Sequence, residues 1–290
     1  MSYRRQKKII IAVFLFLPLL LLAVLWYYPA AKLIQQSFTD WDGLSKYNYV
    51  GFENYASIFG NHDLVKIISN NFAHACAAFI QIAIGLLLAV ILDSKIRGGN
   101  FFKSIIFMPY ILNLAAVAYM FSFLYSYDYS PVNIILRHFG LGGIHWLSGS
   151  YSSNFSLAFV GAWIYTGFVM VIFIGALQSV PRELYEVSEL DGAGFPQKLW
   201  YVTMPNIRTV IELQVFLAIN SSFQVFMQPL LITQGGPGIR TETLVSYTIK
   251  TAFTFRDFGG ASAMGVTLMI AIYLIVSLQR FITGSKGGVF

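Results

Sequence analysis

The 290-residue chain has few charged residues and a single cysteine, and each shortage excludes a class of protein. Charged residues make up 11% of the chain and hydrophobic residues 57%, whereas a water-soluble domain carries about 25% charged residues. The single cysteine, Cys76, excludes a disulfide framework. No G-x-x-x-x-G-K-[ST] sequence occurs, so the chain has no phosphate-binding P-loop of its own. Catalytic triads, dyads and metal-ligand spacings are also missing, and an enzyme is therefore not expected.

Long apolar runs dominate what is present. A helix that crosses a bilayer needs about 20 mainly apolar residues, and six segments reach this length. Lipid offers no water to satisfy open backbone groups, and no period-two alternation occurs, so each run predicts a helix. The expected fold is an all-α membrane protein with spans at Ile9–Tyr28, Ile68–Leu92, Phe101–Ser126, Asn154–Ser179, Arg208–Ile232 and Gly259–Phe281.

The first apolar run follows the basic segment MSYRRQKK, as a signal peptide would. Its apolar core is about 20 residues long, whereas a signal peptide has about 7–15, so an uncleaved anchor is favoured. Six spans place both termini on one side, and most of the 19 basic residues fall in segments on that side, which predicts that it is the cytoplasm. These basic residues are Arg4, Arg5, Lys7, Lys8, Lys95, Arg97, Lys103, Arg182, Lys198, Arg208, Arg280 and Lys286. The net charge of +6 follows from this bias and gives no reason to expect a nucleic-acid partner.

Residues 181–207, here called the 181–207 segment, are a charged, helix-prone stretch between the fourth and fifth apolar runs. Glu186 falls early in a predicted helix, where a carboxylate favours the positive end of the helix dipole. Asp191-Gly192 is a turn signal, and a second helical piece is expected over about 196–202. Two interpretations stay open on physical grounds: a hairpin on the membrane surface that tethers two spans, or a docking element for a cytoplasmic partner.

Polar side chains in the fifth run share one face of the predicted helix. At about 100° per residue, five of them fall within about 120° of one another: Gln214, Asn220, Ser221, Gln224 and Gln228. Phe223 lies beside Asn220, and an aromatic ring next to amides and hydroxyls suits a sugar. Polar groups inside spans indicate a substrate pathway, and hydrogen bonding between helices is the alternative that stays equally open. Trp163 and Tyr165 in the fourth run are further candidates for the pathway.

The 181–207 segment resembles the EAA motif found in permease subunits of bacterial ATP-binding-cassette importers. That motif has Glu-Ala-Ala, a Gly four residues after the second Ala, and an ending of hydrophobic-x-hydrophobic-Pro. Here it reads Glu186-Val187-Ser188, then Asp191-Gly192-Ala193, then Val202-Thr203-Met204-Pro205. Val187 and Ser188 depart from the usual alanines, but both are small enough for close helix packing.

Four other segments resemble the carbohydrate-uptake branch of that family: Ser37–Gly43, Val50–Tyr55, Phe107–Pro109 and Thr233–Pro237. The resemblance covers nearly the whole chain. It is similar to the F-type subunit of maltose permeases, without the extra spans and the large outer insertion of that subunit. It implies a type I importer transmembrane-domain (MetI-like) fold, in which residues 1–290 form a single permease domain with cytoplasmic EAA coupling helices.

The resemblance also implies a function and a set of partners. The chain would be the permease subunit of an ATP-driven, binding-protein-dependent sugar importer in a bacterial inner membrane, with both termini cytoplasmic. It would work with a second permease subunit, a cytoplasmic ATPase dimer that holds ATP and Mg, and an extracytoplasmic sugar-binding protein, and bind no cofactor itself. The coupling residues implied are Glu186, Val187, Ser188, Leu190, Asp191, Gly192, Ala193 and Pro205. The alternatives are an ion-coupled secondary sugar transporter and a permease for glycerol phosphate esters.

Overall fold

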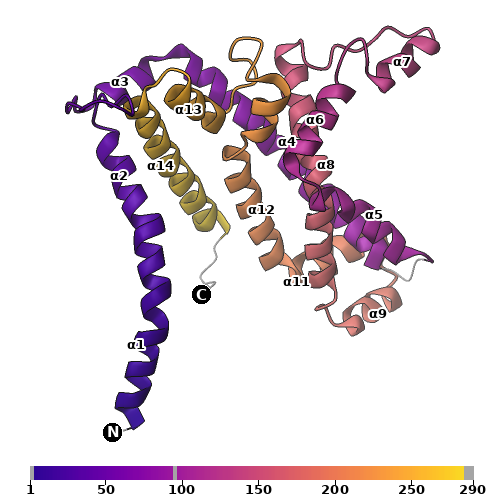
Figure 1. Ribbon diagram of the computed structural model, residues 1–290. Coiled ribbons are helices and arrows are strands. Elements are labelled where there is room, and N and C mark those ends of the chain that lie inside the picture. Colours follow the sequence, from indigo (N-terminus) through magenta and orange to yellow (C-terminus); the bar gives the residue numbers. More distant parts are fainter. Residues whose placement is uncertain (1–2, 94–96, 284–290) are drawn as a thin grey trace. The chain divides into compact units, whose positions relative to one another are not determined.

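The computed structural model describes residues 3–93 and 97–283 (Figure 1). Two basic residues assigned above to the cytoplasmic side, Lys95 and Lys286, lie outside the described residues. The chain divides into two compact units, which are described in turn: Met1–Asn61 with Thr248–Ile270, and His62–Tyr247 with Ala271–Phe290. Within the described ranges the regular structure is helical, apart from one isolated antiparallel bridge between Thr39 and Tyr49.

Several helices have the length and composition of membrane spans. In the described part of the chain, four helices are long and apolar enough to cross a bilayer: Tyr3–Gln36, His62–Asp93, Ser152–Leu177 and Phe258–Gln279. Two bent pairs of shorter helices also pass this test, and counting each pair as one span brings the total to six. These are the features of a multi-pass membrane protein.

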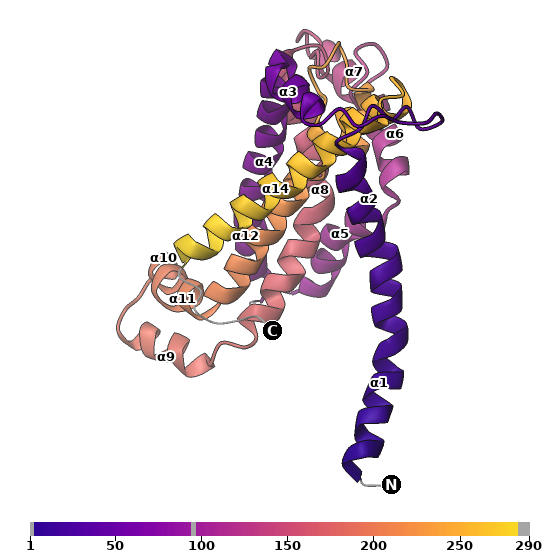
Figure 2. The same ribbon diagram turned by 90° about the vertical axis from the view of Figure 1, so that its left-hand side faces the viewer.

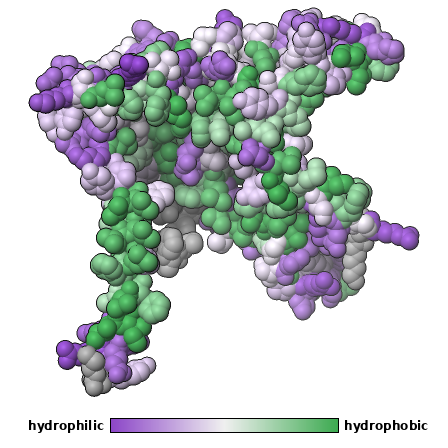
Figure 3. Space-filling model, viewed as in Figure 1, coloured by the Kyte–Doolittle hydropathy of each residue, from purple (hydrophilic) through white to green (hydrophobic). Residues whose placement is uncertain are grey.

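The first unit begins with a continuous apolar helix made of α1 (Tyr3–Leu22), the π-helical turn η1 (Ala23–Tyr27) and α2 (Tyr28–Gln36). Figure 3 shows the apolar surface along α1, with hydrophilic side chains at its N-terminal end. The unit also holds α3 (Glu53–Gly60) and the first part of α14 (Phe258–Thr283). The backbone N–H groups of Phe258 and Gly259 donate to the carbonyl of Trp41 at 2.9 and 3.0 Å, which fixes the loop after α2 to the start of α14.

The same loop contains a tight acidic turn. The carboxylate of Asp42 accepts hydrogen bonds from the backbone N–H groups of Leu44 and Ser45 at 2.9 and 2.7 Å. Because these donors stabilise the charged form, the pKa of Asp42 falls to about 2.

The second unit is built around two long helices, α4 (His62–Asp93) and α8 (Ser150–Leu177), which lie side by side (Figures 1 and 2). Small residues allow their close approach. A Cβ on Gly85 of α4 would lie 2.7 Å from Cγ1 of Val169 on α8. Where α8 meets the helix at 99–111, a Cβ on Gly167 would collide with the backbone carbonyl of Ile106. Membrane helices without a side chain at such crossings gain van der Waals packing between their backbones.

Shorter elements complete the second unit. They are α5 (Gly99–Ile111), α6 (Leu114–Leu124), α7 (Pro131–His138), α9 (Arg182–Leu190), α10 (Phe195–Gln197), η2 (Lys198–Thr203), α11 (Met204–Asn206), α12 (Arg208–Phe223), η3 (Pro229–Thr233) and α13 (Leu244–Phe253), whose last residues belong to the first unit. Two apolar clusters form its core. One surrounds Phe173 and Met170 of α8, and the other joins Phe121 of α6 to Leu157 and Val160 of α8. Figures 1 and 2 both place α7 and the 181–207 segment at opposite ends of this unit.

The span predicted over 101–126 consists of two helices, because the chain bends by 96° between α5 and α6. Pro109 lies inside α5, and the break follows it at Leu112 and Asn113, whose backbones are extended. The side chain of Asn113 accepts hydrogen bonds from the N–H groups of Ala115 and Ala116. It thus caps α6 as the start of a new helix.

The continuous helix predicted over 208–232 is wrong: α12 ends at Phe223, and η3 starts only at Pro229. In an uninterrupted helix the N–H of residue 229 would donate to the carbonyl of Val225, but proline has no N–H. The hydroxyl of Thr243 donates to that carbonyl instead. Similarly, the carbonyl of Ser222 accepts from the side-chain amide of Asn71 on α4 at 2.9 Å. Tertiary hydrogen bonds therefore replace helical ones across the break.

Candidate functional site

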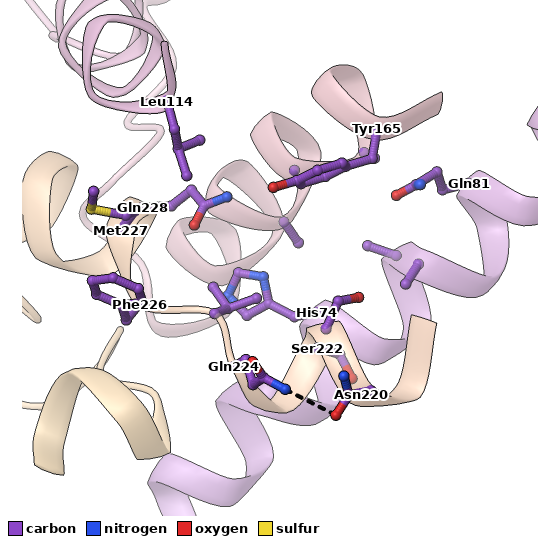
Figure 4. A pocket seen from close by; sticks show the side chains of 17 residues that line it. His74, Gln81, Leu114, Tyr165, Asn220, Ser222, Gln224, Phe226, Met227 and Gln228 are labelled. Atoms are coloured by element: carbon purple, nitrogen blue, oxygen red, sulfur yellow. Dashed lines mark hydrogen bonds between the residues drawn. The ribbon is translucent and has the colours of Figure 1, made fainter. Parts of the chain in front are cut away.

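A cavity of about 310 Å³ opens where α12 breaks (Figure 4). Three parts of the second unit supply its polar lining. The helix α4 contributes His74 and Gln81, α8 contributes Tyr165, and the end of α12 with the break contributes Asn220, Ser221, Ser222, Gln224 and Gln228. Alanines, Gly161, Leu114, Val225, Phe226 and Met227 fill the rest of the wall. None of the lining residues is Asp, Glu, Lys or Arg, so the cavity offers hydrogen bonds without a formal charge.

The break in α12 is what assembles this wall. It allows the chain to turn after Phe223, so that the side chains of Gln224 and Gln228 face the same space as Asn220 and Ser221 of the helix. The side-chain amide of Gln224 donates to Oδ1 of Asn220 at 2.9 Å, which links the two parts of the wall (Figure 4).

A buried set of asparagines holds the segments on either side of the break. Asn71 of α4 donates to the carbonyl of Ser222 and accepts from the N–H of Leu244, both at 2.9 Å. Asn70 donates to the carbonyl of Glu242 at 2.8 Å and accepts from the side-chain amide of Asn154 on α8 at 2.9 Å. Buried side chains that satisfy backbone carbonyls in this way fix the loop before α13 relative to α4 and α8.

A second cavity of about 290 Å³ shares Ala78, Gln81, Tyr165, Asn220 and Ser221 with the first and is therefore next to it. Aromatic rings of α5 and α8 line it: Tyr110 stacks on Phe168 with centroids 4.7 Å apart, and Tyr165 meets Tyr110 edge-on at 6.0 Å. Gln214 of α12 also lines this cavity. It is 3% exposed, and its Nε2 has no hydrogen-bond partner among the described residues.

The structure brings most of the predicted pathway residues together. Asn220, Ser221, Gln224, Gln228 and Tyr165 line the first cavity, and Gln214 lines the second. The reasoning from one helical face holds for the three that lie on α12. It is wrong for Gln224 and Gln228, which follow the end of the helix and reach the cavity through the break.

Two predicted residues lie outside both of these cavities. Phe223 is half-buried and absent from either wall, and the phenylalanine that lines the first cavity is Phe226. Trp163 packs edge-to-face on Phe121 of α6, with centroids 5.4 Å apart, and faces a separate, mainly apolar hollow between α4, α5 and α8.

The prediction from the sequence missed two polar residues of α4, His74 and Gln81. A signal for them is present, because they are seven residues apart in an apolar run and thus share one helical face about two turns apart. In the described part of the chain, no group of three or more His, Cys, Asp or Glu side chains is placed to hold a metal ion.

At the end of the second unit away from α7, the 181–207 segment forms two helical pieces that turn about Gly192, as expected. The first piece, α9, ends in a Schellman motif: the N–H of Gly192 donates to the carbonyl of Glu189 at 3.0 Å, and that of Ala193 to the carbonyl of Ser188 at 2.9 Å. Gly192 has a φ of +77°, the left-handed conformation that this motif requires.

Contacts within the segment hold the two pieces together. Lys198 forms an ion pair with Glu189 at 2.6 Å, and the hydroxyl of Tyr185 lies 3.1 Å from that of Thr203. The second piece, from Phe195 to Asn206, meets α12 at 79°. These contacts therefore hold the two helical pieces of the segment in one arrangement.

One surface of α9 remains open. Glu186 is exposed and makes no ion pair among the described residues. Beside it, Val187 is 56% exposed and Leu190 is 88% exposed. Among the other predicted coupling residues, Asp191, Gly192 and Pro205 are exposed, and Ser188 and Ala193 are half-buried. An acidic group beside exposed apolar side chains is a combination found on surfaces that contact another protein.

Comparison with known proteins gives consistent results. Residues 81–284 match the family model described as binding-protein-dependent transport system inner membrane component. The probable ABC transporter permease protein YurN of Bacillus subtilis is 31% identical, over 97% of this chain and 99% of its own. The diacetylchitobiose uptake system permease protein NgcF of Streptomyces coelicolor is 30% identical, over 95% and 82%. A chain of a bacterial alginate ABC transporter, solved with its alginate-bound periplasmic protein, has the same fold, with a TM-score of 0.86 over 99% of both chains at 18% identity.

Proposed function

The chain belongs to the family of binding-protein-dependent transport system inner membrane components, and on that premise we propose that it is the permease subunit of an ATP-driven importer for an uncharged oligosaccharide. The observation that carries the substrate class is the cavity at the α12 break, whose polar wall has amides, hydroxyls and an imidazole but no charged residue. Sugar hydroxyls both donate and accept hydrogen bonds, and such a wall matches both demands. A phosphorylated ligand would instead favour a cationic wall.

The aromatic rings beside the cavity support the same substrate class. Tyr165 lines both cavities, and Tyr110 and Phe168 extend the aromatic surface into the second one. The face of an aromatic ring packs against the apolar C–H face of a pyranose, while neighbouring amides bond its hydroxyls. The two adjacent cavities thus form part of one pathway, to which Gln214 contributes in the second.

The 181–207 segment is proposed as the coupling element that receives force from a separate ATPase. Its support is the resemblance to the EAA motif together with the open surface of α9, where Glu186 lies next to Val187 and Leu190. Glu186 would pair with a basic residue of the ATPase, and the Schellman motif at Gly192 would hold the angle between the two helical pieces. ATP and Mg would be bound by that ATPase and not by this chain.

The remaining assignments follow from this role. The chain would form one permease domain with six spans, in which α5 with α6 forms the third span and α12 with the chain up to η3 forms the fifth. Both termini and the 181–207 segment would face the cytoplasm, as the distribution of basic residues predicts. A second permease subunit would supply the other half of the pathway, and an extracytoplasmic binding protein would deliver the sugar.

Purification of the tagged chain from membranes of its native host tests this assembly. We expect an ATPase with a P-loop and a second permease of the same family to co-purify in stoichiometric amounts, and mass spectrometry would identify both. A chain that purifies alone or as a homo-oligomer, and that still catalyses sugar uptake after reconstitution, would contradict the proposal and indicate a secondary transporter.

A further inference from the structure

His74 is the one side chain in the cavity wall whose polar atom is both buried and without a partner. The residue is 6% exposed, and its Nε2 makes no hydrogen bond to any described residue. Figure 4 shows the imidazole ring among Gln228, Ser222 and Gln224, at the centre of the lining side chains.

A buried polar atom without a partner needs an explanation, because it has given up its bonds to water. The residues around His74 do not provide one. Asn70 and Asn71, one turn earlier on α4, use their amides on the backbone carbonyls of Glu242 and Ser222. Gln224 uses its amide on Asn220, and the hydroxyl of Ser222 donates to the carbonyl of Ile219. The imidazole of His74 is therefore part of the cavity wall, and its Nε2 is left without a partner among the described residues.

We propose that His74 is a specificity-determining residue of the pathway, whose imidazole hydrogen-bonds a hydroxyl group of an uncharged sugar in the cavity. This inference rests on the proposed function. An imidazole suits a hydroxyl group because each neutral tautomer exposes either a donor or an acceptor, and a hydroxyl pairs with both. Gln81, about two turns along the same face of α4, places a second polar side chain roughly 10 Å away along the helix axis.

The single cysteine of the chain makes a direct test possible. Cys76 lies two residues from His74 on α4 and is not part of the cavity wall, so Cys76→Ala gives a cysteine-free chain that serves as the matched control. In this background, His74→Cys introduces one thiol at the proposed contact. The complete complex in proteoliposomes is then treated with a membrane-impermeant thiol reagent, with and without maltotriose, arabinotriose or diacetylchitobiose.

We expect the new thiol to react, and a sugar that the wild-type complex imports to slow its reaction, while a sugar that is not imported has no effect. A thiol that does not react, or that reacts at the same rate with every sugar, would overturn the proposal. If the wild-type complex imports none of the three, the proposed function fails for this sugar class, and the proposal fails with it.

The amount of sugar imported per ATP hydrolysed is a second measurement, and it would not change if His74 had only a structural role. With saturating binding protein, His74→Leu is expected to lower the sugar imported per ATP hydrolysed by about 5- to 100-fold, because a sugar hydroxyl loses its partner. His74→Gln restores a donor and an acceptor and should recover part of the loss. A misfolded chain would instead lose ATP hydrolysis and uptake together, and an unchanged ratio in His74→Leu would overturn the proposal. ATP-independent uptake by the wild-type complex would count against the proposed function whatever the variants do.

Discussion

Substituting Gly192 perturbs the proposed coupling segment at its single left-handed glycine. With a φ of +77° this residue closes the Schellman motif of α9, and a Cβ built on it would meet no other heavy atom within 4 Å. A substitution therefore strains the backbone without causing a collision. For an ordinary residue the left-handed conformation costs about 1–2 kcal/mol, and for a β-branched residue more, whereas asparagine and aspartate tolerate it.

This geometry predicts a graded series. Gly192→Ala should shift the segment away from its present conformation by about 5- to 30-fold, and Gly192→Val by more. Gly192→Asn should retain most of the activity. Gly192→Asp has a similar backbone tolerance but adds a negative charge beside Asp191, so we expect it to abolish uptake by disturbing the docking surface. The Asn and Asp variants together separate the charge from the backbone.

The assay is sugar uptake by cells in which the amount of each variant in the membrane is measured by immunoblot, together with co-purification of the ATPase. All four variants should reach the membrane, because Gly192 is exposed and outside the core. Wild-type uptake by both Gly192→Val and Gly192→Asp at normal membrane levels would refute the coupling role of this turn.

Three further sets of substitutions, each with a control, test other parts of the account. Glu186→Lys should abolish uptake and ATPase co-purification while the protein reaches the membrane at normal levels. Its control, Glu189→Gln, removes only the exposed ion pair with Lys198 and should keep uptake and co-purification. Equal behaviour of these two variants would contradict the role of Glu186. Ser221→Ala, Gln224→Ala and Gln228→Ala should each reduce uptake, with Phe223→Leu as a control outside both cavities; unchanged uptake in all three would leave these side chains as links between helices. Asn71→Leu should lower the free energy of unfolding by about 1–3 kcal/mol, because the Ser222 carbonyl loses its donor. The measurement is the Tm of the solubilised protein, which should fall in this variant and stay unchanged in the control Ser69→Ala on the same helix.

The sequence was sufficient to predict the helices whose stability is local. The first, second, fourth and sixth apolar runs form long helices, because the backbone groups of an uninterrupted apolar run in lipid have no alternative to helical hydrogen bonds. The turn at Gly192 was also predictable, because Asp-Gly after a helical pattern is a local signal. The family could be inferred from motifs spread along the chain.

The break in the fifth run could not be predicted in the same way. The break after Phe223 depends on Asn71 and Thr243, which are far from it in sequence and supply the hydrogen bonds that the helix gives up. Because the sequence does not reveal that break, it places Gln224 and Gln228 on a helix face. It likewise predicts Phe223 as the phenylalanine of the pathway, whereas Phe226 lines the cavity. His74 was missed for a related reason, since nothing in the order of residues shows that its side chain faces a cavity.

The most direct test of the central claim is sugar uptake by proteoliposomes that contain the complete complex, with the binding protein outside and ATP trapped inside. We expect accumulation of the sugar only when both are present, and its loss with vanadate or with a non-hydrolysable ATP analogue. Uptake that proceeds without internal ATP, is insensitive to vanadate, and follows a proton or sodium gradient would contradict the account.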